Sequence, residues 1–186
     1  MSNYQLPLHN ENTAPLQAHP TLVESRKNYG FIPNLHAIMA ESPALLRAYA
    51  MISDIFEETS FSDTEKQLIL LSVSHENDCD YCMAAHSAVA HIKNVPADII
   101  AALRSGQPLV DTKLESLRQL VNSVINNRGH AKVYEVNAFL NAGYSTGQLL
   151  DVLVGVGMKT LSNYTNHIAD TPLDTQFQSQ TWKKAS

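Results

Sequence analysis

Two segments of the chain are apolar on nearly every side, and they constrain the fold more than any other feature. The first runs from residue 65 to about residue 75, and the second from residue 148 to about residue 164. Helices without a polar face must be packed by neighbours on all sides, so both segments are expected to be central. Each follows a capping box, which begins at Ser62 or Ser145 and marks the start of a helix.

The other apolar residues also recur at helical spacing. After Ser42-Pro43, a typical helix start, they fall at Leu45, Tyr49, Ile52 and Phe56. The same spacing recurs over residues 114–124 and 133–140, and Gly143 ends the second of these. No stretch alternates polar and apolar residues for long enough to predict a strand. The sequence therefore predicts an all-α, single-domain helical bundle with two central apolar helices.

The length of 186 residues suits one domain. Such a chain buries roughly 70% of its unfolded surface in a single core and needs no disulfide to fold. We expect an irregular N-terminal arm over residues 1–19, because prolines punctuate it without any period. The all-helical domain is expected over residues 20–170 and a C-terminal tail over residues 171–186.

Charge and hydropathy exclude several classes of partner. The net charge is −5, and no basic stretch is longer than Lys183-Lys184, which argues against nucleic acid and anionic membranes. The longest aliphatic run, residues 68–71, is far too short to span a bilayer. The N-terminus has no cationic start followed by an apolar core, so no secretory signal is expected and the cytoplasm is the default location.

The two cysteines of the chain, Cys79 and Cys82, stand at positions i and i+3, which share one face of a helix. In a reducing compartment such a pair is more often catalytic or metal-binding than structural. Asn77 and Asp78 are good N-cap residues, so a helix is expected to open there with Cys79 in its first turn. Thiol pKa values at that place fall from about 8.5 to roughly 3.5–7.5.

Two further residues complete a candidate redox site. His86 stands one turn beyond Cys82 and could polarise or protonate its sulfur. Glu76 could orient that imidazole or take its proton. The pattern favours thiol–disulfide chemistry, in which Cys82 attacks the substrate and Cys79 resolves the product into a disulfide. The reverse assignment stays open, because the first cysteine of a pair at a helix start often has the lower pKa.

The pair also allows different interpretations. Cys79, Cys82 and His86, with His75 or Glu76 as a fourth ligand, could hold zinc, although most structural zinc sites draw ligands from two separate pairs. The cysteines could also be incidental core residues, or the protein could be a redox-inactive module that binds a small ligand. No Gly-rich phosphate loop is present, and no cofactor is expected.

These residues resemble a known family. The motif is similar to the core of the alkylhydroperoxidase D-like proteins of the carboxymuconolactone decarboxylase superfamily, and the N-terminal part resembles a peroxidase-related branch. The matching stretches are Glu76-x-x-Cys79-x-x-Cys82-x-x-x-His86, Phe31-Ile32-Pro33-Asn34 and Ser42-Pro43. The resemblance implies an all-helical fold, assembly as trimers or hexamers, and reduction of a hydroperoxide substrate. Electrons would come from an unknown thiol or protein reductant.

The chain departs from that family at two positions. The best-known members carry a proton-relay glutamate twelve residues before the first cysteine, where this sequence has Gln67. A histidine between their cysteines is Tyr81 here. Because a neutral amide is not a base, the relay is expected to use Glu76 or Glu65.

A second polar group follows the second apolar segment. It consists of Asn163, Asn166 and His167. These side chains would line the pocket if the two apolar helices pack side by side; otherwise they satisfy a helix end.

Overall fold

The computed structural model describes residues 5–184, and within them the chain forms nine α-helices and two short 3-10 helices but no strand. The all-α prediction is confirmed. In chain order the elements are η1 Leu16–Ala18, α1 His19–Tyr29, α2 Asn34–Met39, α3 Pro43–Glu57, α4 Asp63–Glu76, α5 Asp80–Ile92, α6 Ala97–Ser105, α7 Thr112–Asn126, α8 Val133–Asn141, α9 Thr146–Ala169 and η2 Thr175–Gln180.

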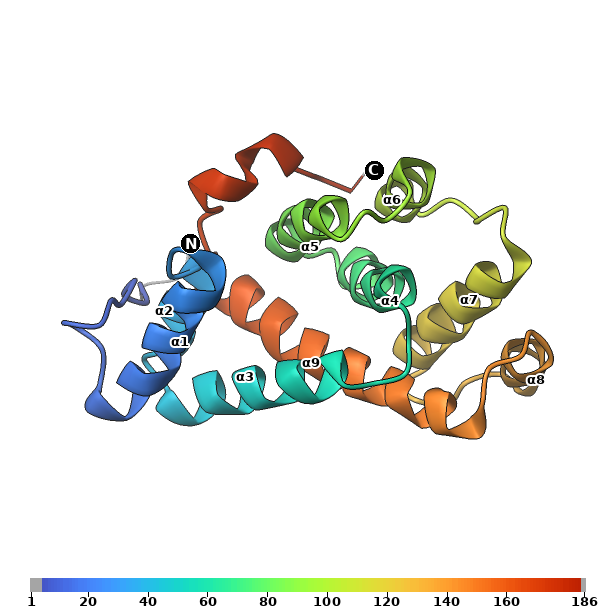
Figure 1. Cartoon of the computed structure of the whole chain (residues 1–186), viewed down its shortest axis with the longest axis horizontal. Coiled ribbons are helices and arrows are strands. Elements are labelled where there is room, and N and C mark those ends of the chain that lie inside the picture. Colours follow the sequence, from blue (N-terminus) through green and yellow to red (C-terminus); the bar gives the residue numbers. More distant parts are fainter. Residues whose placement is uncertain (1–4, 185–186) are drawn as a thin grey trace.

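Helix α4 lies at the centre of the bundle. Every residue from 65 to 74 is buried, and the helix contacts α5, α6, α7 and α9 (Figure 1). An all-round apolar sequence is what such a position requires, because no side of the helix meets water. The prediction that this segment is a central helix is confirmed.

Both expected capping boxes form. The Ser62 N–H donates to Glu65 Oε2 at 2.8 Å, and the Glu65 N–H donates to Ser62 Oγ at 3.3 Å. At α9 the Ser145 N–H donates to Gln148 Oε1 at 3.0 Å, with the reciprocal bond also at 3.0 Å. Each pair satisfies amides that the first turn of a helix leaves without partners.

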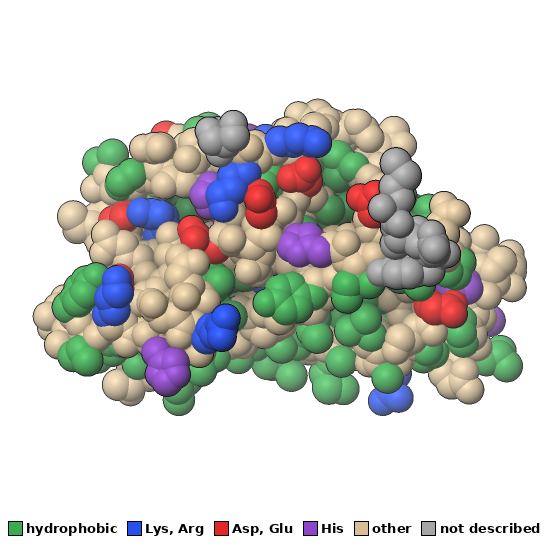
Figure 2. Space-filling model, turned by 180° about the vertical axis from the view of Figure 1, so that it is seen from behind, with side chains coloured by type: hydrophobic (Ala, Val, Ile, Leu, Met, Phe, Trp, Pro, Cys, Tyr) green, Lys and Arg blue, Asp and Glu red, His purple; other side chains and the backbone are tan. Residues whose placement is uncertain are grey.

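The second apolar helix, α9, packs on α3 and α4 but keeps one face exposed. Leu150 and Leu153 are 65% and 49% exposed, and Met51 and Ile55 of α3 add to the same side of the molecule. Hydrophobic side chains gather along the lower edge in Figure 2, where α3 and α9 run. The apolar sequence of α9 is thus only partly covered within one subunit. No helix in the described part of the chain is long and apolar enough to cross a membrane.

Helices α3, α4 and α9 approach one another closely at Gly155. A Cβ atom at this position would lie 2.8 Å from Ile69 Cγ2 and 2.9 Å from Phe56 Cε2. Carbon atoms do not pack at such distances, so the spacing of the three helices depends on the missing side chain.

The junction between α4 and α5 differs from the expectation. Asn77 ends α4, Asp78 adopts a left-handed conformation with φ of 57°, and Cys79 is the N-cap of α5. Asn and Asp tolerate this conformation, so here they terminate one helix rather than open the next. The predicted helix start at Asn77 or Asp78 is wrong by one to two residues. The side chain of Asn77 donates to Asn163 Oδ1 at 2.9 Å, which ties the junction to α9.

The C-terminal segment packs against the rest of the chain. Helix η2 lies over α5, and both Phe177 and Trp182 are buried (Figure 1). The Trp182 Nε1–H donates to the Arg104 carbonyl at 2.7 Å. At the other end, helix α1 begins at His19, where the expected arm ends. Residues 1–4 of that arm and residues 185–186 of the expected tail lie outside the described residues.

Candidate active site

Cys79 and Cys82 lie together at the start of α5 as free, buried thiols, 1% and 2% exposed. Cys79 occupies the N-cap position, and its own N–H donates to the Ser74 carbonyl at 2.9 Å. Cys82 lies in the first turn, where backbone amides still lack helical partners. The helix start therefore holds both sulfurs in a polar backbone environment within an otherwise apolar interior.

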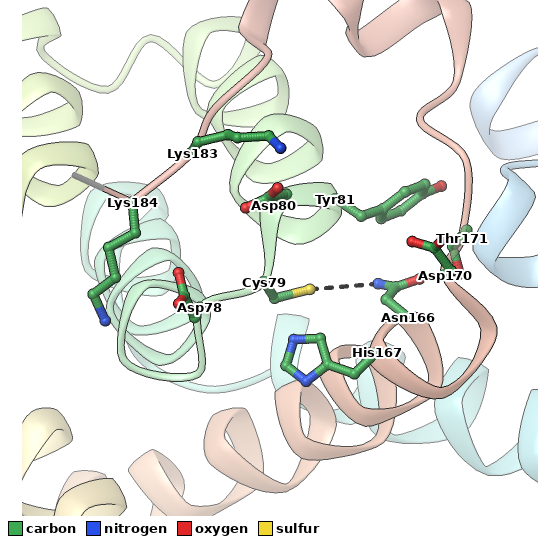
Figure 3. Close-up of a pocket in the computed structure, with 10 residues that line it drawn as sticks. All are labelled: Asp78, Cys79, Asp80, Tyr81, Asn166, His167, Asp170, Thr171, Lys183 and Lys184. Atoms are coloured by element: carbon green, nitrogen blue, oxygen red, sulfur yellow. Dashed lines mark hydrogen bonds between the residues drawn. The ribbon is translucent and has the colours of Figure 1, made fainter. Parts of the chain in front are cut away.

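Helix α9 supplies the side chains around the sulfurs. Asn166 Nδ2 donates to Cys82 Sγ at 3.2 Å and reaches Cys79 Sγ at 3.7 Å (Figure 3). Ser162 Oγ lies 3.7 Å from Cys82 Sγ. The two apolar helices do lie side by side, so Asn166 lines the site, which was one of the two possibilities left open by the sequence.

Lys159 is the residue that sequence reasoning missed. It is fully buried in α9, and its Nζ atom has no hydrogen-bond partner in the described part of the chain. It shares one face of the helix with Ser162 and Asn166, which follow at i+3 and i+7. A lysine inside an apolar helix was a visible signal, since an unpaired buried cation is costly and requires a nearby anion.

That anion is the Cys82 thiolate. Burial opposes ionisation of Cys82, but the hydrogen bond from the Cys79 thiol and the positive charge of Lys159 outweigh it and hold the Cys82 pKa well below its ordinary value. The pKa of Cys79 is raised, first by its interaction with Cys82 and then by burial. Cys82 is therefore the more acidic thiol of the pair, and Cys79 is the thiol that donates to it.

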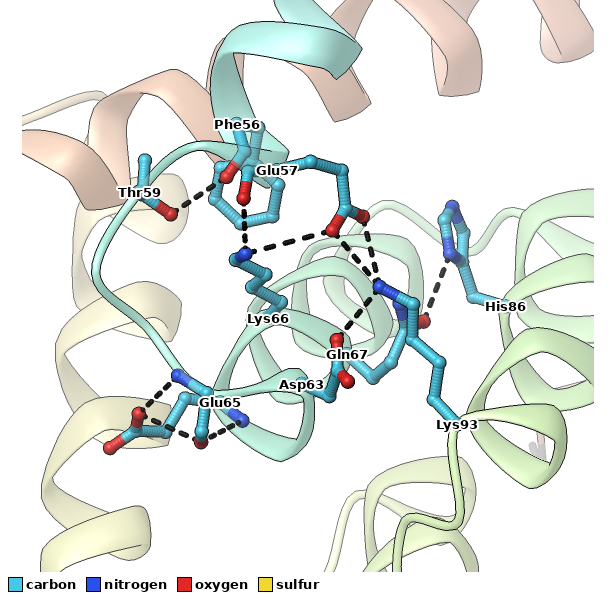
Figure 4. Close-up of polar contacts among 10 residues, drawn as sticks. Phe56, Glu57, Thr59, Asp63, Glu65, Lys66, Gln67, His86 and Lys93 are labelled. Atoms are coloured by element: carbon cyan, nitrogen blue, oxygen red, sulfur yellow. Dashed lines mark hydrogen bonds and ion pairs between the residues drawn. The ribbon is translucent and has the colours of Figure 1, made fainter.

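His86 contacts Gln67 rather than a carboxylate. Its Nδ1 atom lies 3.2 Å from Gln67 Oε1, an amide oxygen that accepts the ring N–H (Figure 4). Burial lowers the pKa of His86 well below its usual value, and the charges of Lys159 and Lys93 add to the effect. The Cys82 pKa is lowered by the hydrogen bond from Cys79 and then by Lys159, not by His86. The side chain of His86 lines the same cavity as Cys82, and its part in the proton relay stays a prediction.

Glu76 is not part of the site. Its carboxylate accepts from Asn126 Nδ2 at 2.9 Å and lies 3.6 Å from His75 Nδ1. The prediction expected it to reach the cysteines from the end of the preceding helix. In the structure it lies in the last turn of α4, just before the left-handed residue Asp78, and contacts Asn126 of α7 instead.

Glu65 is likewise occupied elsewhere. Its carboxylate closes the capping box at the start of α4 (Figure 4) and forms an ion pair with Lys113 at 3.5 Å. No contact joins it to Cys79, Cys82 or His86 among the described residues. The described residues thus place neither Glu65 nor Glu76 in contact with the cysteines or His86, and the glutamate relay stays a prediction without support from these contacts.

Tyr81 has a structural role between the two cysteines. Its hydroxyl donates to Asp174 Oδ2 at 2.5 Å and accepts from the Leu35 N–H at 3.3 Å. Asp174 also accepts from the Asn34 N–H at 3.0 Å. These bonds join α5, α2 and the segment before η2, and they close the interior over the cysteine pair.

The two cysteines face different cavities. Cys82 lines a narrow apolar cavity of about 50 Å³, together with His86, Lys159 and aromatic walls that include Tyr49 and Phe177. Cys79 lines a polar cavity of about 390 Å³ on the other side of the pair. One sulfur is thus presented to an apolar compartment and the other to a charged one.

No cluster of three or more His, Cys, Asp or Glu side chains within residues 5–184 is positioned to hold a metal ion. His75 and Glu76, the proposed fourth ligands, lie on α4 beside Trp182 and Asn126, respectively. The zinc interpretation therefore has no ligand set.

The fold and the site define an all-helical protein with a buried, polarised Cys-x-x-Cys pair. The model of the carboxymuconolactone decarboxylase family matches residues 40–110, which include both cysteines and His86. The alkylhydroperoxidase D-like fold is confirmed, as solved structures match nearly the whole chain.

Three similar structures illustrate the range of proteins with this fold. An uncharacterised peroxidase-related protein from Ralstonia eutropha JMP134, described as an alkylhydroperoxidase AhpD core, has a TM-score of 0.78 at 17% identity and covers 95% of both chains. The debrominase Bmp8 has a TM-score of 0.79 at 17% identity over 97% of both chains. A peroxidase-related protein from Silicibacter sp. TM1040 has a TM-score of 0.76 at 17% identity, covering 95% of this chain and 94% of its own. No curated protein matches the sequence significantly.

Proposed function

We propose that the protein is an enzyme that reduces hydroperoxides with the Cys79–Cys82 pair. The observation that carries this proposal is the asymmetry of the two thiols. The hydrogen bond from Cys79 and the charge of Lys159 hold the pKa of Cys82 well below its ordinary value, while the pKa of Cys79 is raised. A thiolate with a neighbouring resolving thiol is what two-electron reduction of a peroxide requires.

The reaction proceeds in two displacements. The Cys82 thiolate attacks the terminal oxygen of the hydroperoxide, the O–O bond breaks, and the alkoxide takes a proton to leave as an alcohol. Cys82 is then a sulfenic acid. The sulfur of Cys79 attacks it, the S–O bond breaks, and the hydroxide leaves as water with the proton of Cys79. The hydroperoxide gains two electrons and the cysteine pair becomes a disulfide.

The apolar cavity beside Cys82 favours small organic hydroperoxides. Its walls include Tyr49, Leu35 and Phe177, and the charge of Lys159 is the principal polar feature near the sulfur. That charge stabilises the thiolate before attack and the developing alkoxide afterwards. His86 borders the same space as a neutral group and orients the substrate or accepts a hydrogen bond.

The test is direct. Fully reduced protein is mixed with one equivalent of tert-butyl hydroperoxide or hydrogen peroxide, and peroxide consumption is followed alongside the mass of the cysteine peptide. We expect one peroxide consumed per chain and the loss of two protons from the peptide, faster with the organic peroxide. Cys82→Ser should consume none. A pair that stays reduced in mild peroxide would refute the proposal.

A second candidate is reductive dehalogenation of a small aromatic compound. The fold is shared with a debrominase, one structure of which contains a cysteine-to-alanine variant with 2,3,4-tribromopyrrole. In this chain the aromatic-lined cavity beside a thiolate supports the same idea. Replacement of a bromine by hydrogen would likewise oxidise the pair to a disulfide and release bromide. Bromide release from tribromopyrrole without peroxide consumption would favour this candidate.

Simpler measurements separate peroxide reduction from disulfide exchange and from plain ligand binding. A thiol–disulfide oxidoreductase without peroxidase activity would exchange with protein disulfides but leave peroxides intact. A redox-inactive binding module would show both thiols alkylated with an unperturbed pKa of about 8.5. The hydroperoxide substrate, the thiol or protein reductant, the trimeric or hexameric assembly and the cytoplasmic location remain predictions.

A further inference from the structure

The polar cavity over Cys79 carries charges of both signs. Asp80 and Asp170 lie on its walls, as do Lys183 and Lys184 from the C-terminal segment (Figure 3). Its volume of about 390 Å³ falls within the usual range for small-molecule sites, about 300–1,000 Å³. The walls could therefore pair with a compact ligand that itself bears both charges.

Two buried polar atoms at this cavity lack partners. Asn166 is 5% exposed, and its Nδ2 atom donates to the sulfurs of Cys82 and Cys79. Its Oδ1 atom accepts no hydrogen bond from the described residues. The Oγ1 atom of Thr171 is also buried and has no hydrogen-bond partner among the described residues. In Figure 3 the oxygen of Asn166 lies on the side of Asp170 and Thr171, away from Cys79. Buried acceptors are normally satisfied, so these atoms indicate a missing donor, such as an ammonium or amide N–H group.

One of the two lysines at the cavity also lacks a hydrogen-bond or ion-pair partner among the described residues. Lys184 donates to the His75 carbonyl at 3.0 Å, whereas Lys183 has no hydrogen bond or ion pair within residues 5–184. A carboxylate bound at the Lys183 ammonium would form a charge-assisted contact. The negative Asp80 and Asp170 would then face the positive end of the same ligand.

We propose that this cavity binds a low-molecular-weight thiol with both carboxylate and ammonium groups, and that this thiol reduces the Cys79–Cys82 disulfide. The inference rests on the proposed redox function, because it names the class of the reductant. Cys79 is the sulfur at the cavity, yet it is only 1% exposed. A slender thiol fits such a recessed sulfur better than the surface of a protein dithiol.

The chemistry follows from which sulfur faces the cavity. The thiolate of the ligand attacks Cys79 Sγ, the S–S bond breaks, and Cys82 leaves as a thiolate beside Lys159. A stabilised thiolate is the better leaving group. A second ligand thiol attacks the sulfur of the first, which releases Cys79 and a small-molecule disulfide. Two ligand thiols are oxidised and one protein disulfide is reduced.

The experiment measures only the reduction of the Cys79–Cys82 disulfide by a thiol, separately from its formation by peroxide. The protein disulfide is formed with diamide instead of peroxide, and its reduction is followed with glutathione, cysteine and uncharged 2-mercaptoethanol, each rate corrected for the thiolate fraction. We expect saturable reduction by glutathione or cysteine, about tenfold or more faster than by 2-mercaptoethanol at low concentration, a ratio equivalent to one good charged contact.

A matched pair of variants locates the effect. Lys183→Gln/Lys184→Gln should lose most of the advantage of the charged thiols, read as the ratio of the glutathione or cysteine rate to the 2-mercaptoethanol rate of the same variant. Lys27→Gln/Lys132→Gln removes the same charge from exposed positions outside the cavity and should change neither rate.

Equal, non-saturating rates for all three thiols would overturn the inference, as would rapid reduction by a thioredoxin-type protein with slow reduction by every small thiol. Failure of the proposed function looks different. The diamide-formed disulfide would still be reduced by the charged thiols, but the reduced protein would not consume peroxide.

Discussion

Asn166 Nδ2 donates a hydrogen bond to Cys82 Sγ at 3.2 Å, across 84 positions of the sequence. The bond joins α9 to the first turn of α5. Because its donor and the neighbouring Lys159 both belong to α9, the properties of the Cys82 sulfur depend on a helix remote from the Cys-x-x-Cys motif. The first two predictions follow from this arrangement.

Replacing Lys159 with methionine should raise the pKa of Cys82 by about one unit or more, because a nearby positive charge favours the thiolate. The variant should remain folded, since it exchanges a buried ammonium without a hydrogen-bond partner in the described residues for an apolar side chain of similar length. The pH dependence of alkylation at Cys82 measures the shift. Lys66→Met is the control, as this lysine is also buried but bonds to the Glu57 carbonyl away from the cavity. An unchanged Cys82 pKa in Lys159→Met would contradict the assignment.

The two cysteine variants should behave differently after one equivalent of peroxide. Cys79→Ser should accumulate a sulfenic acid at Cys82, because attack occurs but nothing resolves it. Cys82→Ser should give almost no trapped product, since Cys79 lacks the thiolate environment. A dimedone-type trap with mass spectrometry reads both results. Labelling of Cys82→Ser without labelling of Cys79→Ser would reverse the roles.

Neither Glu65 nor Glu76 should be needed for the chemistry. Glu65→Gln and Glu76→Gln should each consume peroxide within about twofold of the unsubstituted protein, because neither carboxylate contacts the site. Glu65→Ala should cost about 1 kcal/mol of stability through loss of the capping box. Peroxide kinetics and urea denaturation distinguish the two effects. A large loss of activity in Glu76→Gln with an intact fold would restore the relay hypothesis.

Stability should fall in mild acid because of His36. Burial lowers the pKa of this histidine to about 4, against about 6.5 in the unfolded chain. Between these values the unfolded state binds more protons, so the free energy of unfolding decreases as pH falls from 6.5 to about 4, by up to about 3 kcal/mol.

Urea denaturation over this pH range measures the effect. His36→Gln should make the profile shallower without flattening it, because burial also lowers the pKa of His86 and this residue contributes in the same direction. His130→Gln, at an exposed loop position, should leave the profile unchanged. An equally steep profile in His36→Gln would show that other groups are responsible.

The exposed apolar edge of α3 and α9 should be an interface between copies of the chain. Met51, Ile55, Leu150 and Leu153 are each about half exposed or more, which is a large apolar area for a free surface. Light scattering should give an oligomer at micromolar concentration. Leu150→Glu/Leu153→Glu should weaken it, and Val110→Glu, a fully exposed position elsewhere, should not. A monomeric unsubstituted protein would contradict the prediction.

Local patterns in the sequence were sufficient for the helices. Ser62 and Ser145 mark two helix starts by capping boxes, and both form. These patterns act within a few residues and need no knowledge of the rest of the chain. The break at Asp78 was missed because Asn and Asp suit both a helix start and a left-handed helix end, and only the packing of α5 against α9 selects between them.

The site could be predicted only where its residues are close together in the sequence. Cys79 and Cys82 lie together because they share one turn of helix. Lys159 and Asn166 reach them from α9, a contact that spacing along the chain does not reveal. Glu76 shows the opposite error, since a short separation in sequence was mistaken for proximity across a helix break. Side chains near in sequence separate at turns, and side chains far apart meet only through tertiary packing.

Gly155 precedes Lys159 by one helical turn and shares its side of α9. Its missing side chain lets α9 pack directly against Phe56 and Ile69. A methyl group there would clash with both side chains, so α9 would have to shift, and Lys159 with it. We therefore expect the acidity of the Cys82 thiol to depend on helix spacing as well as on charge, through a residue that has no contact of its own with either sulfur.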